Sequence, residues 1–315
     1  MILQPKSALQ GLAAYSVPRV NGVIDLHLDG NEGLVPPDGL ISSVQSMTGN
    51  VLRRYPSTSP LEATLACRLG VEAERVIVTS GGDDALDRAC RAMLSQGDNL
   101  ILPSPSFEML WRYANLQGAG VLRPAWLEGA WPRQAVIDCI TDRTRCIAVV
   151  TPNNPTGAVA TIEDIIAVSR AAPRALILVD LAYVEFADED PTLACLECPN
   201  VVVFRTLSKA WGLAGLRVGY ALGPPEVVGW LRASGNPYPV SAPSLALATT
   251  WLSQGQEAAA QFVECVRAQR QTLTALLADA GVSPLPSQAN FVFCRPPDAL
   301  GLWRGLGDLG IAIRA

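Results

Sequence analysis

The sequence contains two lysines, and one of them lies among residues that would make its amine reactive. Lys209 follows hydroxyl residues at Thr206 and Ser208, and Arg217 comes later in the same small and apolar stretch. Apolar surroundings and a second cation lower the pKa of a lysine amine, which favours attack on a carbonyl carbon. An arginine with nearby hydroxyls suits the binding of a phosphate. The segment therefore predicts Schiff-base chemistry beside a phosphate site.

Two segments nearer the N-terminus have features of a ligand site. Residues 80–84 (SGGDD) combine small residues with the start of a predicted helix, where free N–H groups could bind a phosphate. Gly81, Gly82 and Asp83 are the candidates there, although the acid also fits ordinary helix capping. Phe107 begins another predicted helix. Its ring could stack on a flat ligand or belong to the core.

Two further segments could hold the polar edge of such a ligand. Residues 151–157 (TPNNPTG) contain two prolines and a glycine, which stiffen a turn and hold Asn154 in one place. Asp180 ends an apolar run, and Tyr183 follows three residues later. A buried acid needs a cationic partner, whereas structural capping is the alternative reading of this aspartate.

The elements that must position these side chains alternate along the chain. Continuous apolar runs separated by helical patterns predict an α/β fold, with a mainly parallel sheet flanked by helices. In such sheets ligands lie at the carboxyl ends of the strands, so the segments above should face one site. The expected strands are 75–79, 99–102, 145–150, 175–180, 201–204 and 217–222, and the expected helices between them are 83–94, 107–117 and 162–171.

The chain is expected to divide into a large and a small part. Residues 51–225 form the large cofactor-binding domain, and the irregular residues 1–50 pack with a smaller α/β domain. Residues 226–315 supply connecting helices and the rest of that small domain. Its expected helices are 241–252, 254–280 and 299–309, and its expected strands are 290–294 and 311–314.

Composition excludes several classes of protein. The 315 residues are 49% hydrophobic, enough for a large core. The net charge is −5, a poor match to nucleic acid, and no apolar run reaches the roughly 18 residues of a membrane span. The first ten residues do not resemble a signal peptide. Eight scattered cysteines and one histidine indicate reduced thiols and no metal site. We predict a cytoplasmic protein without nucleic-acid or membrane partners.

Taken in order, the motifs resemble those of a known family. SGGDDAL, TPNNPTG, VDLAY and TLSKAWGLAGLRVGY are similar to the motifs of pyridoxal-phosphate-dependent aminotransferases of fold type I (class I/II). The histidinol-phosphate aminotransferase group is the most similar. The resemblance covers residues 15–315 and implies pyridoxal 5′-phosphate as the cofactor.

The resemblance implies a role for each cofactor-site residue. Lys209 would form the internal aldimine and later move the proton of the substrate α-carbon. Asp180 would pair with the pyridinium nitrogen, Tyr183 and Asn154 would bond the ring hydroxyl, and Phe107 would stack on the ring. The phosphate would be held by Gly81, Gly82, Asp83, Thr206, Ser208 and Arg217.

Other matching positions concern the substrate and a partner subunit. Tyr55 matches the residue with which such enzymes reach the neighbouring subunit's cofactor phosphate, which implies a homodimer. Tyr15 and Asn31 match substrate-side positions. Arg295 and Arg314 match positions that face the distal end of the substrate.

The implied reaction moves an amino group from a donor, usually glutamate, to an oxo acceptor such as imidazole-acetol phosphate. A threonine-phosphate-type decarboxylase and a specialised biosynthetic aminotransferase share these motifs and remain alternatives. A non-catalytic pyridoxal-phosphate-binding regulator fits poorly, because such proteins carry a DNA-binding segment before the motifs.

Two departures from the family pattern are visible. Leu181 stands where the family often has an acid, a change that leaves the catalytic groups intact. The family's arginine that binds the substrate carboxylate lies beyond the last strand, and the sequence ends at Ala315 without it. We expect either that the small domain is truncated or that the carboxylate is bound differently.

Overall fold

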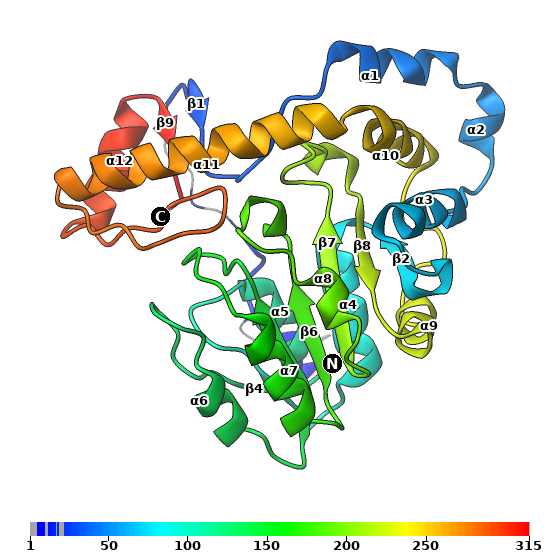
Figure 1. The fold of residues 1–315 in the computed structure, drawn as a ribbon, viewed down its shortest axis with the longest axis horizontal. Coiled ribbons are helices and arrows are strands. Elements are labelled where there is room, and N and C mark those ends of the chain that lie inside the picture. The colour runs from blue at the N-terminus through cyan, green and yellow to red at the C-terminus, as the bar shows by residue number, and fades with distance from the viewer. Residues whose placement is uncertain (1–4, 10–11, 17, 19–21, 315) are drawn as a thin grey trace, which may run out of the picture.

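A seven-stranded sheet forms the centre of the molecule (Figure 1). The structure is a computed structural model, and it describes residues 5–9, 12–16, 18 and 22–314. The strand order is β2-β8-β7-β6-β5-β3-β4; β8 runs antiparallel to both of its neighbours and the other pairs are parallel. The strands are β2 (Val76–Thr79), β3 (Asn99–Ile101), β4 (Gly120–Leu122), β5 (Thr144–Val150), β6 (Leu176–Asp180), β7 (Val201–Thr206) and β8 (Gly219–Leu222).

The predicted mainly parallel sheet, covered on both faces, is confirmed. Along β6 every side chain is buried, and successive residues enter opposite cores: Ile177 and Val179 one, Leu176 and Leu178 the other. This explains why the strands are continuous apolar runs and not alternating ones. One core takes side chains from α4 (Gly81–Met93), α5 (Glu108–Leu116) and α9 (Pro225–Ala233). The opposite core takes them from α3 (Ser59–Leu69), α6 (Arg133–Asp138), α7 (Ile162–Ala171), α8 (Thr192–Cys195), α10 (Ala242–Gln254) and α11 (Gln256–Asp279).

The carboxyl ends of the central strands lie in register. Val150, the last residue of β5, is level with Asp180, the last residue of β6, and Asp180 is level with Phe204 in β7. The loops that follow these strands therefore leave the sheet at one edge. This register brings together the polar segments that lie far apart in the sequence.

A second, small sheet lies at the far end of α11 (Figure 1). It pairs β1 (Leu26–His27) in parallel with β9 (Ile311–Ala312), and α12 (Ala299–Asp308) precedes β9. N-terminal and C-terminal segments therefore form one unit. The predicted break before the long helix is also present, because Gly255 separates α10 from α11.

Two sequence-based expectations about this region are wrong. Residues 290–294 form no strand: their pairing among the described residues is an isolated bridge between Pro284 and Cys294, beside a bond from Leu285 N to Phe293 O. In this segment the side chains of Asn290 and Phe291 contact Asn31 and Tyr183 of the site. Residues 1–50 are not wholly irregular either, since they hold β1, α1 (Asp38–Ser42), two 3-10 turns and the first residues of α2 (Gly49–Arg53).

Short 3-10 turns complete the fold, and the predicted site residue Tyr183 directly precedes one of them, η4. The 3-10 turns are η1 (Ser7–Leu9), η2 (Ser43–Ser46), η3 (Ala73–Arg75), η4 (Val184–Phe186) and η5 (Ala214–Leu216).

No helix within the described ranges has the length and apolar character needed to cross a membrane. Cytoplasmic location stays a prediction.

Candidate active site

Lys209 lies half-buried in the loop after β7, and its amine faces Gly30 and the ring of Tyr183. Its Nζ donates to the carbonyl oxygen of Gly30 at 3.0 Å and lies 5.5 Å from the centre of the Tyr183 ring. Burial is the main cause that lowers the pKa of Lys209 to about 8; the negative charges of Glu32 and Asp83 oppose this change, and the positive charges of Arg217 and Arg314 add to it. The amine is thus available in its neutral, nucleophilic form near neutral pH.

Glycines allow the N-terminal segment to pass directly over this lysine. A Cβ at Gly33 would lie 1.6 Å from the main-chain oxygen of Lys209. A Cβ at Gly212, whose φ is +67°, would lie 1.7 Å from the oxygen of Leu34. Only residues without a side chain permit this contact. The close approach explains how Gly30 reaches the lysine amine.

Asp180 ends β6 with its carboxyl group buried. Oδ1 accepts a hydrogen bond from the main-chain N–H of Ala182 at 3.0 Å. Burial raises the pKa of Asp180 to about 7, although this hydrogen bond and the positive charge of Lys209 lower it. A buried carboxyl group in this state would be stabilised by a bound cation.

Tyr183 receives hydrogen bonds from two amides that come from different parts of the chain. Its phenolic oxygen accepts from Nδ2 of Asn31 at 3.2 Å and from Nδ2 of Asn154 at 3.4 Å. The edge of the Phe291 ring packs on it with centroids 5.1 Å apart. Burial raises the pKa of Tyr183 to about 12. The phenol therefore keeps its proton and can donate it to a ligand.

The predicted phosphate-binding residues also come together, although two of them are far apart in the sequence. Arg217 Nη2 lies 3.3 Å from Oδ2 of Asp83, and a Cβ at Gly81 would lie 2.6 Å from the same nitrogen. Thr206 Oγ1 donates to Ser208 Oγ at 2.9 Å and accepts from the Ser208 N–H at 3.1 Å. Gly82 faces Thr206, since a Cβ there would be 3.9 Å from the threonine Cβ. The result is a cradle of hydroxyl groups, N–H groups and one guanidinium.

Asn153 ties two of the site loops together and was not predicted from the sequence. Its side chain is fully buried; Oδ1 accepts from Ser106 Oγ at 2.7 Å and Nδ2 donates to Pro105 O at 2.9 Å. Its neighbour Asn154 and the neighbour of Ser106, Phe107, are both predicted site residues. Asn153 therefore fixes the distance between these loops. The signal in the sequence is the pair Asn153 and Asn154 inside a stiff turn, of which only Asn154 was predicted as a site residue.

Arg205 was also missed, although it is the single charge in the apolar strand β7. It is buried and pairs with Glu185 at 3.0 Å and Asp190 at 2.9 Å. Burial alone would raise the pKa of Asp190, but the charge of Arg205 and the hydrogen bonds from Thr192 together lower it. A charged side chain buried in a strand needs such partners. The position of Arg205 in an apolar run was therefore the signal that could have identified it.

The predicted substrate-side residues fall into two groups. Arg314 Nη2 donates to the phenolic oxygen of Tyr15, and the Arg112 guanidinium lies 5.7 Å from the centre of that ring. The positive charge of Arg314 also lowers the pKa values of Lys209 and Tyr183, so Arg314 lies on their side of the molecule. Arg295 instead forms an exposed ion pair with Glu128 at 2.8 Å.

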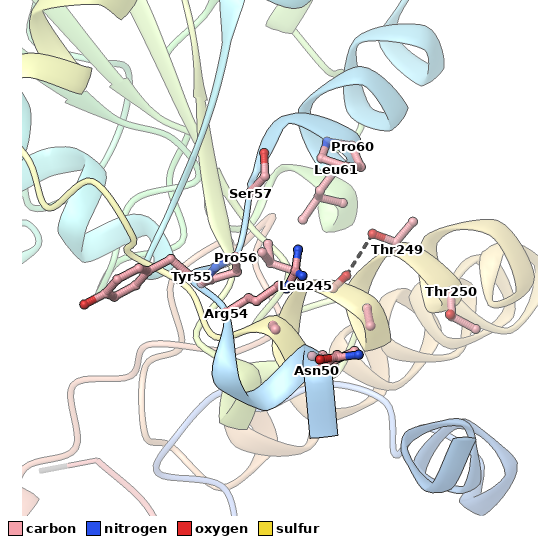
Figure 2. A pocket seen from close by; sticks show the side chains of 13 residues that line it. Asn50, Arg54, Tyr55, Pro56, Ser57, Pro60, Leu61, Leu245, Thr249 and Thr250 are labelled. Carbon is pink, nitrogen blue, oxygen red and sulfur yellow. Dashed lines mark hydrogen bonds between the residues drawn. The ribbon is translucent and has the colours of Figure 1, made fainter. Parts of the chain in front are cut away.

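Tyr55 lies apart from these groups, beside a surface groove. Its ring is 80% exposed and stacks on Tyr238 with centroids 4.3 Å apart. The groove has a volume of about 670 Å³ and is lined mainly by α2, α3, α10 and the segment that joins α2 to α3. Figure 2 shows Tyr55 pointing away from the other labelled side chains of the groove. A residue placed in this way is free to contact another molecule.

The fold and the site define the class of protein. The chain belongs to the aminotransferase class I and II family, which it matches over residues 28–315. The aromatic amino acid aminotransferase of Cutibacterium acnes is 32% identical over 313 residues, or 96% of this chain and 85% of that protein. Histidinol-phosphate aminotransferase 1 of Bacillus anthracis is 34% identical over 245 residues, or 75% of this chain and 65% of that protein.

A solved structure shows the same fold. Histidinol-phosphate aminotransferase from Sinorhizobium meliloti, crystallised in complex with pyridoxal-5′-phosphate, superimposes with a TM-score of 0.87 at 23% identity. The match covers 100% of this chain and 89% of that one. The similarity to this structure establishes the architecture, and the chemistry must be argued from the residues present here.

Pyridoxal phosphate is the cofactor of this class, and the described residues fit it. Lys209 has an amine with a lowered pKa, Asp180 has a buried carboxyl group suited to a ring cation, and Arg217 with its neighbouring hydroxyls suits a phosphate. When bound, the cofactor supplies an electron sink for bonds broken at the substrate α-carbon.

Proposed function

We propose that this aminotransferase moves an amino group between glutamate and an oxo acceptor of the imidazole-acetol phosphate type, with Lys209, Asp180 and Tyr183 as its catalytic residues. One observation carries the proposal: the half-buried Lys209 amine, whose pKa is lowered, lies close enough to the buried Asp180 carboxyl group, whose pKa is raised, for its charge to act on it. Neighbouring groups that are shifted in this way are typical of catalytic sites.

Each catalytic residue has a role that follows from its surroundings. Lys209 would hold the cofactor through Nζ, and once the substrate amine takes its place the free Nζ would accept the proton from the substrate α-carbon. Asp180 would pair with the cofactor's ring nitrogen. The Tyr183 oxygen already accepts from two asparagine amides, so its own proton is left to donate to the ring oxygen.

The remaining cofactor contacts divide between the ring and the phosphate. Asn154 would bond the ring edge, and Phe107 would stack on the ring face. The phosphate would be held by the start of α4, by two hydroxyl side chains and by one guanidinium, which the Asp83 carboxylate orients. The phosphate-binding residues are Gly81, Gly82, Asp83, Thr206, Ser208 and Arg217.

Arginine and tyrosine side chains are proposed for the substrate side. Tyr15 and Arg314 contact one another, Arg314 affects the pKa of Lys209, and Asn31 contacts Tyr183. We assign Arg314 to an anionic group at the distal end of the substrate, together with Arg295, which is paired with Glu128. A phosphorylated substrate agrees with this charge and with the Bacillus anthracis relative. An aromatic substrate agrees with the Cutibacterium acnes relative, and Tyr15 offers a ring against which it could pack.

We further propose that the protein acts as a homodimer, in which Tyr55 reaches the phosphate of the neighbouring subunit. The exposed position of Tyr55 and its stacking on Tyr238 support this assignment. The apolar groove beside it provides surface that a second copy could cover.

A half-reaction assay tests the proposed function. The protein loaded with pyridoxal phosphate is mixed separately with L-glutamate, L-phenylalanine and histidinol phosphate, and both the visible absorbance band and the released oxo product are followed. We expect the band to disappear and one equivalent of oxo product to form with glutamate and with histidinol phosphate. Lys209→Ala should lose the band, and Lys6→Ala should keep it.

Other outcomes separate the alternatives. A response to phenylalanine with none to histidinol phosphate would assign the enzyme to aromatic substrates. Release of carbon dioxide from O-phosphothreonine, with no oxo product from any donor, would identify a decarboxylase and reject transamination.

A further inference from the structure

Helix α11 runs from the central part of the molecule to the small sheet (Figure 1). Two of its arginines, Arg267 and Arg270, bind main-chain oxygens near the site. Arg267 donates to the carbonyl oxygens of Glu185, Phe186 and Ala187. Arg270, one turn later, donates from Nη1 to Phe186 O at 3.3 Å and to Ala289 O at 2.7 Å. Arg270 therefore joins two segments that are about a hundred residues apart in the sequence.

Both of the joined segments lead directly to Tyr183. The first is the 3-10 turn η4, which Tyr183 precedes as the N-cap residue. The second is residues 289–291, in which Asn290 Nδ2 donates to Asn31 O at 3.1 Å and the Phe291 ring packs edge-on against Tyr183. Asn31 in turn donates to the Tyr183 oxygen. One guanidinium thus fixes both the main chain of the tyrosine and the groups that contact its ring and oxygen.

Both bonds of this bridge come from one nitrogen of Arg270. Nη1 carries two N–H groups, so it can serve the carbonyl oxygens of Phe186 and Ala289 at once, and the guanidinium stays charged. Burial lowers the pKa of Arg270, while the negative charge of Asp188 opposes this change. Glutamine lacks the charge and the reach, and lysine has a compact ammonium group in place of the fork.

We propose that Arg270 is a positioning residue for Tyr183: it holds η4 and residues 289–291 at one separation and so aims the phenol at the cofactor ring. The proposal rests on the role proposed above for Tyr183. It adds a residue on the outside of the site that acts only through main-chain carbonyl groups.

The test is a double-mutant cycle between Arg270→Gln and Tyr183→Phe. Two quantities are measured for each variant: the affinity of the cofactor-free protein for pyridoxal phosphate, from tryptophan fluorescence, and the pH at which the visible band of the loaded protein titrates. We expect Arg270→Gln to weaken affinity by roughly three- to tenfold and to move the titration midpoint in the same direction as Tyr183→Phe. In the Tyr183→Phe background Arg270→Gln should add little.

Matched variants make the outcome decisive. Gln271→Ala changes an exposed residue of the same helix and should match the wild type, while Arg270→Lys should fall between the wild type and Arg270→Gln. If Arg270→Gln does not fold, Arg270→Lys takes its place in the cycle.

Three results would overturn the proposal. Fully additive effects would show that Arg270 does not act through Tyr183. A lower melting temperature with unchanged affinity and midpoint would reduce Arg270 to a structural residue. If Tyr183→Phe itself left both quantities unchanged, the proposed role of Tyr183 would fail together with this inference, whereas the first two results leave that role intact.

Discussion

The Asp180 carboxyl group shows how one residue links stability to cofactor binding. In the folded chain burial raises its pKa from the ordinary 3.8 to about 7. The folded state therefore holds this proton more tightly than the unfolded state does between these two pH values. Stability must then fall as the pH rises through that window. A cation bound beside the carboxylate removes the cost of its charge.

We expect Asp180→Asn to stabilise the cofactor-free protein at pH 8 and to destabilise the loaded one. Without cofactor the variant should melt about 2 °C or more above the wild type, and the difference should shrink as the pH falls from 7 towards 4. With cofactor the order should reverse, because a neutral amide cannot pair with a ring cation. Thermal melts at several pH values, with the exposed Asp142→Asn as the control, measure both effects. The same order of stability in both states would contradict this assignment.

At the scale of elements, the segment 30–34 and the loop 209–212 fit together through two glycines. The clash distances at Gly33 and Gly212 involve main-chain atoms, which cannot move aside as a flexible side chain can. The contact positions Gly30 against Lys209 and Asn31 against Tyr183. Residues 30–34 of the N-terminal segment therefore form part of the site.

Gly33→Ala should force these two elements apart. We expect a loss of about 1–3 kcal/mol in the free energy of unfolding, together with weaker pyridoxal phosphate binding. Gly39→Ala is the matched control, because a Cβ there meets open space and should change stability by less than about 0.5 kcal/mol. Urea denaturation and cofactor titration provide the measurements. Equal losses in the two variants would count against a specific contact.

The same scale shows what the sequence could predict. The central strands were recognised because strands buried on both faces are continuous apolar runs, and their carboxyl ends carry the polar motifs. The strand expected at residues 290–294 is wrong because a short run of β-forming residues does not reveal whether a partner strand is available. Asn153 and Arg270 could not be predicted as site residues, since they act through groups distant in sequence: Asn153 bonds Ser106 and Pro105, and Arg270 bonds two main-chain oxygens. Such contacts leave no local pattern of residue types.

At the scale of the whole molecule, the exposed Tyr55 and its groove are the features that bear on the proposed association of two subunits. A lone exposed tyrosine is ordinary, but this one is held by stacking on Tyr238, whose N–H donates to Asn236 Oδ1 at 2.9 Å. Arg88 of α4 binds the carbonyl oxygen of the same asparagine at 3.1 Å. The tyrosine is thus tied to the helix that begins at the phosphate cradle of its own subunit.

Mixing two defective variants should restore one site of wild-type cofactor affinity if subunits share their sites. In a heterodimer of Lys209→Ala and Tyr55→Ala, the subunit that keeps its lysine receives Tyr55 from its partner. We expect Tyr55→Ala alone to bind pyridoxal phosphate about tenfold more weakly, and the mixture to regain wild-type affinity in one of the two sites. Light scattering establishes the number of subunits. A monomer, or a mixture no better than its components, would rule out the shared site.

The identity of the reactive lysine is the most direct test of the whole account. The protein is loaded with pyridoxal phosphate, reduced with borohydride and digested, and the modified peptide is identified by mass spectrometry. Because the chain has only Lys6 and Lys209, the result is unambiguous. We predict the pyridoxyl group on Lys209, with Lys6 unmodified. Modification of Lys6 alone, or no modification after saturation with cofactor, would contradict the proposed function.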